Sequence, residues 1–193
     1  MGGKELGLYK LRGAKDDFLR GLACFAHAHG VTPNAMTFLG LCFGVAAGAM
    51  FAFRQMQLGF ALGLVSVFCD MLDGAIARNF HLETLRGKVL DAACDRVSEL
   101  VVVLGALAGG IIAPLGTIAI IGSATLLVFR VISYSKGANT DYALFGRTER
   151  LIFIMLGLLS PSVAASTICF ITAGVFGIVS SLQIAVNLVR HGK

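Results

Sequence analysis

The sequence predicts an all-α integral membrane protein, with residues 1–193 forming one domain. The expected architecture is a bundle of six transmembrane helices with a short N-terminal amphipathic helix at the membrane interface. Hydrophobic residues make up 56% of the chain and charged residues only 14%, whereas soluble domains average about 25% charged residues. The mean hydropathy is +0.83. This composition argues against a soluble enzyme, a disordered chain or a nucleic-acid-binding module, so no nucleic acid partner is expected.

The six spans follow from apolar stretches that approach the roughly 20 residues needed to cross a bilayer. They cover residues 35–53, 57–78, 89–109, 111–134, 150–168 and 168–189. Pro114 lies near the start of the fourth stretch, a position where proline is tolerated. The last two spans are expected to be joined by a tight turn that contains Ser160, Pro161 and Ser162.

Residues 1–30 are expected to form a cytoplasmic and interfacial N-terminal segment. They contain no uninterrupted apolar core, which argues against a cleavable signal peptide. Within this segment Asp16 to His29 mixes apolar and polar residues in an amphipathic pattern. Such a helix can lie in the membrane interface, and an ordinary packing helix is the equally open alternative.

The basic residues predict the orientation of the bundle in a cell membrane. With six spans both termini share one side, and that side collects nearly all the lysines and arginines outside the spans. They are Lys4, Lys10, Arg12, Lys15, Arg20, Arg78, Arg86, Lys88, Lys136, Arg147, Arg150, Arg190 and Lys193. The opposite loops hold only Arg54. The positive-inside rule therefore places both termini on the cytoplasmic side, where the net charge of +5 suits anionic lipids and phosphate-bearing substrates.

Four aspartates stand where the second span meets the third. Asp70 and Asp73 are three residues apart, and Asp91 and Asp95 are four apart, so each pair shares one face of its helix. A short cytoplasmic turn between the two helices brings both faces together. Ionisable residues in spanning segments usually mark a functional site. The alternative is four solvated acids paired with nearby arginines and lysines at a helix–loop junction.

These acids predict a divalent-metal site, because four carboxylates in one cleft repel each other unless a cation neutralises them. Mg²⁺ suits carboxylates combined with substrate phosphates, and a pair of metal ions suits displacement at phosphorus. Gly74 lets a ligand approach the backbone beside Asp73. Arg78 offers a planar fork that matches a diphosphate.

The spacing D-x-x-D-G-x-x-A-R-x8-G-x3-D-x3-D is matched at every fixed position from Asp70 to Asp95. It resembles the signature of the CDP-alcohol phosphotransferase family of integral membrane enzymes. The resemblance implies a transferase of substituted phosphate groups, which moves a phosphate-linked group from a CDP-alcohol to an acceptor hydroxyl and releases CMP. It also implies dependence on Mg²⁺ or Mn²⁺, with two ions, and a homodimer.

The resemblance also implies roles for individual residues. Asp70, Asp73 and Asp91 would bind metal, and Asp95 would complete the metal site and act as the general base on the acceptor. The CDP-linked donor would contact Asn34, Thr37, Asp70, Gly74, Arg78 and Thr84. The first two belong to the element P-N-x-x-T, in which helix capping is an alternative role that can coexist with donor binding.

A second basic cluster predicts that the acceptor carries a phosphate, bound by Lys136, Arg147 and Arg150. The strings S-Y-x-K and R-x-E-R-L resemble the branch of the family that uses inositol 1-phosphate to make phosphatidylinositol phosphate or archaetidylinositol phosphate. Glycerol 3-phosphate as acceptor, CDP-inositol as donor in di-myo-inositol phosphate phosphate synthesis, and a purely topological role for these charges remain alternatives. An ion-coupled transporter is the alternative from a different class.

Overall fold

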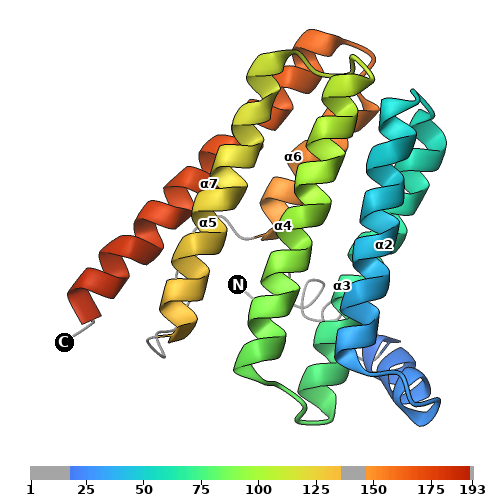
Figure 1. Ribbon diagram of the computed structural model, residues 1–193, viewed down its shortest axis with the longest axis vertical. Helices are drawn as coiled ribbons and strands as arrows, with labels where there is room; N and C mark the ends of the chain where they lie inside the picture. Colours follow the sequence, from blue (N-terminus) through green and yellow to red (C-terminus); the bar gives the residue numbers. More distant parts are fainter. Residues whose placement is uncertain (1–17, 136–146, 192–193) are drawn as a thin grey trace, which may run out of the picture.

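The computed structural model describes residues 18–135 and 147–191, and within these ranges the elements are helices joined by short loops, without a β-strand. A first helix is described over residues 18–28. The elements that follow are α2 (Pro33–Ala52), α3 (Met56–Asn79), α4 (Leu85–Ala108), a 3₁₀ turn η1 (Pro114–Thr117), α5 (Ile118–Ser135), α6 (Arg147–Leu159) and α7 (Val163–His191). Helices α2 to α7 run alternately up and down along one axis (Figure 1).

The helices form two groups. Helix α2 packs against α3 and α4, α7 packs against α5 and α6, and α4 joins the groups by its contact with α5. The largest apolar core lies at the upper end in Figure 1, where Phe51, Val103, Leu158 and Phe170 are at most 2% exposed. Toward the lower end α5 and α7 lean away from α2, α3 and α4 (Figure 1).

Glycines allow the closest helix contacts. A Cβ atom added to Gly105 on α4 would lie 2.0 Å from the carbonyl oxygen of Gly48 on α2, and one added to Gly122 on α5 would lie 2.1 Å from that of Gly174 on α7. Small residues at helix interfaces are how membrane helices bring their backbones into contact. In each group, therefore, the backbones of two helices are in direct contact, α2 with α4 and α5 with α7.

Among the residues that the structure describes, four segments are long and apolar enough to cross a membrane: Pro33–Ala52, Met56–Asn79, Pro114–Tyr134 and Val163–Leu188. The predicted spans in α4 and α6 do not meet this standard. Helix α4 is long enough with 24 residues but carries several charged side chains, and α6 has 13 residues, or about 20 Å at 1.5 Å per residue.

The predicted turn at Ser160, Pro161 and Ser162 between the last two spans is confirmed. Helix α6 ends at Leu159 and α7 begins at Val163, so these three residues join the two helices. Proline ends α6 here because it lacks the N–H group that a continuing helix requires. The span limits at residue 168 are wrong, since that residue lies inside α7; the length rule placed them there because residues 163–168 continue the apolar run.

The helix at residues 18–28 packs on the lower end of α3. Leu19 and Ala23 are buried with Leu72 and Ile76, while Phe18 on the same helix is 62% exposed. The segment is therefore helical, with Leu19 and Ala23 packed against the bundle and Phe18 exposed. Its location at a membrane interface stays a prediction.

Candidate metal centre and active site

The four aspartates lie on two neighbouring antiparallel helices that a five-residue connection joins at the lower end of the bundle. Asp70 and Asp73 belong to α3, and Asp91 and Asp95 belong to α4. Thr84 accepts a hydrogen bond from the backbone N–H of Gly87 at 3.0 Å and so caps the start of α4. This cap fixes where α4 begins and hence which α4 residues face α3.

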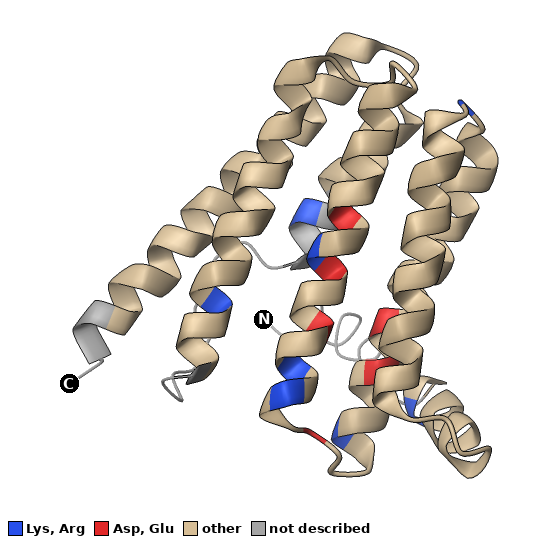
Figure 2. Ribbon diagram, viewed as in Figure 1, with Lys and Arg blue, Asp and Glu red and all other residues tan. Residues whose placement is uncertain are grey.

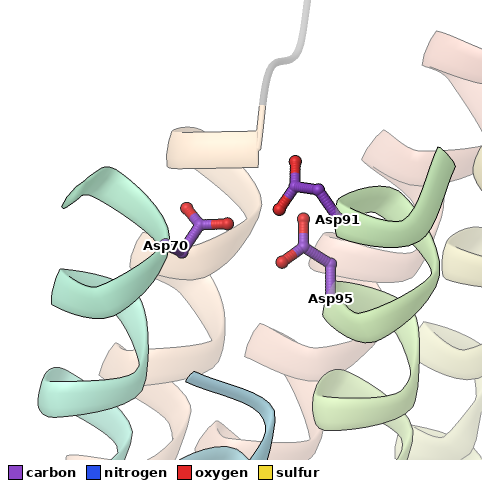
Figure 3. Close-up of side chains that lie close together, drawn as sticks. All are labelled: Asp70, Asp91 and Asp95. Atoms are coloured by element: carbon purple, nitrogen blue, oxygen red, sulfur yellow. The ribbon is translucent and has the colours of Figure 1, made fainter. Parts of the chain in front are cut away.

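Asp70, Asp91 and Asp95 point toward one another across the gap between α3 and α4 (Figure 3). One carboxylate oxygen from each lies within 4.8 Å of the others, and all three residues are half-buried. Oxygen ligands from three acids at this spacing fit a hard divalent cation such as Mg²⁺ or Mn²⁺. The structure therefore brings together three of the four predicted metal ligands.

Asp73 has a different environment. It is 5% exposed and accepts a hydrogen bond of 2.6 Å from the hydroxyl of Thr37 on α2. It is not part of the three-carboxylate group, although it lines a small cavity together with Asp70, Asp91 and Asp95. Its role as a metal ligand stays a prediction.

Five of the six predicted donor contacts line one cavity of about 150 Å³. They are Asn34, Thr37, Gly74, Arg78 and Thr84, and the wall also includes Asp73 and Asp91. The sixth, Asp70, lines the small adjoining cavity. Residues from α2, α3, α4 and the loop before α4 thus converge beside the aspartate group.

Gly74 leaves room for the side chain of Arg78. A Cβ atom at this position would lie 3.1 Å from Nη1 of Arg78, tighter than ordinary side-chain contacts. The glycine therefore permits the guanidinium to lie across the surface of α3 at the cavity. A planar cation in this position can pair with two oxygens of a diphosphate.

Two charged residues of the cavity wall were not among the predicted site residues. Lys88 and Glu83 form an ion pair of 2.8 Å at the mouth, with both side chains largely exposed. The hydrogen bond and positive charge of Lys88 lower the pKa of Glu83. The position of Lys88, directly after the motif glycine Gly87, is the sequence feature that could have identified it.

The predicted acceptor residues differ in what the structure describes of them. Lys136 lies outside the described residues, and Arg147 is described only as the first residue of α6. Arg150 is 2% exposed, and its Nη2 donates to Glu99 on α4 and Ser123 on α5. Its Nε donates to the carbonyl oxygen of Ala173 on α7 at 3.2 Å. Its contact with an acceptor stays a prediction.

Charged residues gather at one end of the molecule. Figure 2 shows Asp, Glu, Lys and Arg on α3, α4, α5 and α6 from the lower end up to about the middle of the molecule, while the upper end is almost free of them.

Residues 30–186 match the family model described as CDP-alcohol phosphatidyltransferase. The chain belongs to this family.

Characterised members of the family are similar over about two thirds of the chain. A phosphatidylinositol phosphate synthase from Mycobacterium marinum is 37% identical over 142 residues, which cover 66% of this chain and 58% of the relative. An archaetidylinositol phosphate synthase from Methanothermobacter thermautotrophicus is 33% identical over 126 residues, 65% of either chain. The chain thus spans less than two thirds of the length of these relatives.

Solved structures of the family share the fold. The phosphatidylinositol phosphate synthase of Mycobacterium tuberculosis with CDP-DAG bound has a TM-score of 0.72 and 27% identity, and covers 87% of this chain and 92% of that one. The same enzyme in complex with manganese and citrate has a TM-score of 0.73, with coverage of 89% and 88%.

Proposed function

We propose that the protein transfers a phosphate-linked group from a CDP-alcohol to the hydroxyl of an acceptor alcohol and releases CMP. The observation that carries this proposal is the cavity lined by Asn34, Gly74, Arg78 and Thr84 beside three converging carboxylates. Basic and hydroxyl side chains suit a nucleoside diphosphate, and carboxylates suit the metal that accompanies it. Membership of the family and the CDP-DAG complex of the M. tuberculosis relative support the same reading.

Asp70, Asp91 and Asp95, together with Asp73, are proposed to hold Mg²⁺ or Mn²⁺, as two ions. When bound, the metal would neutralise the negative charge of the donor diphosphate and of the departing CMP phosphate. The manganese complex of the M. tuberculosis relative supports this assignment, and so does the 4.8 Å grouping of three carboxylate oxygens in this chain.

The remaining steps belong to the protein's own residues. Arg78 orients the donor diphosphate, and Asn34 and Thr84 contact the CDP part. Asp95 removes the proton of the acceptor hydroxyl as that oxygen forms a bond to phosphorus and the bond from phosphorus to the CMP oxygen breaks. General-base assistance of this kind is worth about 10² to 10⁴ in rate.

Inositol 1-phosphate is the proposed acceptor, giving phosphatidylinositol phosphate or archaetidylinositol phosphate. The two relatives, a phosphatidylinositol phosphate synthase and an archaetidylinositol phosphate synthase, support it, as do the cations Lys136 and Arg147. We expect Lys136→Ala and Arg147→Ala to raise the acceptor KM roughly 10-fold each, as expected for loss of a charge-assisted hydrogen bond. Steady-state kinetics measure this, with Arg54→Ala at the other end of the bundle as control. Unchanged KM values in both variants would mean that these two charges serve only to orient the protein in the membrane.

We further propose that α4 and α6 also cross the bilayer, giving six crossings in a cell membrane, with the active site and both termini on the cytoplasmic side, and that the protein is a homodimer. The concentration of charge at one end of the bundle supports this orientation.

The orientation is tested with single cysteines placed at Gln55 and at Leu82 in a cysteine-free background, which are labelled with a membrane-impermeant maleimide. Labelling of both from the same side would contradict it, and crosslinking in native membranes tests the dimer.

The direct test is CMP release by the purified protein with Mg²⁺ or Mn²⁺. CDP-diacylglycerol, CDP-archaeol and CDP-inositol are each offered with inositol 1-phosphate, glycerol 3-phosphate or serine. Metal-dependent CMP release with inositol 1-phosphate and a CDP-lipid is the expected result. Release only with glycerol 3-phosphate, or only with CDP-inositol as donor, would replace the proposed substrate. Folded protein that releases no CMP with any pair would contradict the proposed function and favour a transporter.

A further inference from the structure

A second group of charged side chains is buried next to the aspartates. Arg96 and Glu99 lie one turn apart on α4 and form an ion pair of 2.7 Å, and Glu99 also accepts from Arg150 on α6. The three side chains are at most 10% exposed. Charges buried inside a membrane bundle are costly unless they are paired, and here two arginines share one carboxylate.

This group connects α4 to the rest of the bundle. Through Arg150, Glu99 is linked to the hydroxyl of Ser123 on α5 and to the backbone of Ala173 on α7. Helices α5, α6 and α7 therefore fix the position of α4 at this level, although none of them contributes a residue to the three-carboxylate group. Because the guanidinium group is a planar fork, it holds its partners in a defined geometry rather than at a loose distance.

Arg96, at the other end of this charged group, lies close to Asp95, the proposed base. Nη2 of Arg96 lies 4.0 Å from Oδ2 of Asp95, at ion-pair distance, while its Nη1 is held by Glu99. A cavity of about 50 Å³ is lined by Asp95, Arg96, Glu99 and Arg150 together. The side chain of Asp95 thus stands between the other aspartates and a guanidinium whose own position is fixed from α6.

We infer that Arg150, Glu99 and Arg96 form a positioning chain that holds Asp95 in place for metal binding and proton removal. The inference rests on the proposed function and adds three residues to it. They touch neither donor nor acceptor in this role and act through Asp95. The role differs from acceptor binding by Arg150, since it requires the guanidinium to stay with Glu99 and Ser123 during the reaction.

The test uses Arg96→Lys and Arg150→Lys, because lysine keeps the charge but lacks the fork. Ser166→Ala is the matched control: it removes a fully buried hydrogen bond of 2.8 Å from α7 to Gly157 on α6, outside the chain of charges. Each variant is assayed for kcat, for both KM values, for melting temperature, and for Mn²⁺ binding by electron paramagnetic resonance.

Both arginine variants are expected to lower kcat and weaken Mn²⁺ binding by about 10- to 100-fold, as substitutions behind a metal ligand typically do. Both KM values stay near those of the wild type, and the control changes neither kcat nor Mn²⁺ binding. The double variant falls little below the worse single variant, because residues that act as one unit are not additive.

Two results would overturn the inference. One is a raised acceptor KM in Arg150→Lys with unchanged kcat and Mn²⁺ binding, which would make Arg150 an acceptor ligand. The other is loss of Mn²⁺ binding only in proportion to loss of folded protein. If the wild type releases no CMP, the proposed function fails, yet Mn²⁺ binding by the variants still tests the positioning chain.

Discussion

The two groups of charged side chains in this bundle are built in opposite ways. Asp70, Asp91 and Asp95 bring three charges of the same sign within 4.8 Å, whereas Arg96, Glu99 and Arg150 alternate in sign. Alternating charges neutralise one another inside the protein and so stabilise a fixed geometry. Like charges held together store repulsion that a bound cation relieves. The group of three aspartates therefore indicates a ligand site, and the group of alternating charges indicates a structural role.

The largest effect is expected at the point where the two groups meet. Asp95→Asn keeps the shape of the side chain but removes its basicity, so kcat should fall by about 10² to 10⁴. CMP release measures the loss, and binding of a CDP donor, followed by calorimetry, should largely persist. Turnover near the wild-type rate would remove Asp95 as the base.

A stability comparison tests whether the two groups differ as described. Glu99→Gln leaves two buried arginines without their shared carboxylate and should lower the free energy of unfolding by about 3–5 kcal/mol. Asp91→Asn relieves like-charge repulsion and should leave the metal-free protein as stable as the wild type, or more so. Melting temperatures in detergent without metal measure both. Equal destabilisation by Glu99→Gln and Asp91→Asn would contradict the proposed difference between the two charged groups.

Metal should separate Asp91→Asn from the wild type. Mn²⁺ is expected to raise the melting temperature of the wild type, because a ligand that binds only the folded state stabilises it. The gain should be smaller in Asp91→Asn. A titration of melting temperature against Mn²⁺ concentration measures this, and equal shifts in both proteins would place the ion elsewhere.

A smaller effect is expected at Asp73, which belongs to neither group. Thr37→Val removes the hydroxyl that donates to its carboxylate, and loss of one such hydrogen bond costs about 1–3 kcal/mol when the acceptor is buried. Chemical denaturation measures it. Thr172→Val, which removes a hydrogen bond of 2.9 Å within the exposed face of α7, is the control and should change stability less.

The smallest effect is expected at the exposed pair Glu83 and Lys88. Lys88 lowers the pKa of Glu83, so this pair contributes stability above the ordinary glutamate pKa of about 4.3. The contribution is lost as the pH falls through the lowered pKa in the folded state. Lys88→Met should therefore be slightly less stable than the wild type at pH 7, and the difference should shrink as the pH falls below about 4.3. A difference that does not shrink in acid would contradict the charge assignment.

Whether a contact in the site could be predicted from the sequence depends on how far apart its two residues lie along the chain. The aspartates lie within 26 residues of one another on two adjacent helices, so helical spacing and a short connection suffice to place them. The pairing of Arg150 with Glu99 spans 51 residues and depends on how α6 packs, which no local pattern encodes. The pairing of Arg96 with Glu99 is different, since the two residues lie three apart on α4 and such a spacing predicts an ion pair from the sequence.

The helix borders are set by local features. Thr32 and Thr84 cap α2 and α4 by accepting hydrogen bonds from the N–H groups three residues on, a feature that the sequence can predict. The turn between α6 and α7 is likewise predictable from Ser160, Pro161 and Ser162, because proline cannot continue a helix. Span length alone, which set both span limits at residue 168, did not locate this turn.

The glycine contacts at Gly48, Gly105, Gly122 and Gly174 have a mechanical consequence. Where two backbones touch, no flexible side chain separates them, so sliding or spreading of the two helices of each pair is restricted. Helices α2 and α4, and likewise α5 and α7, are therefore expected to move together.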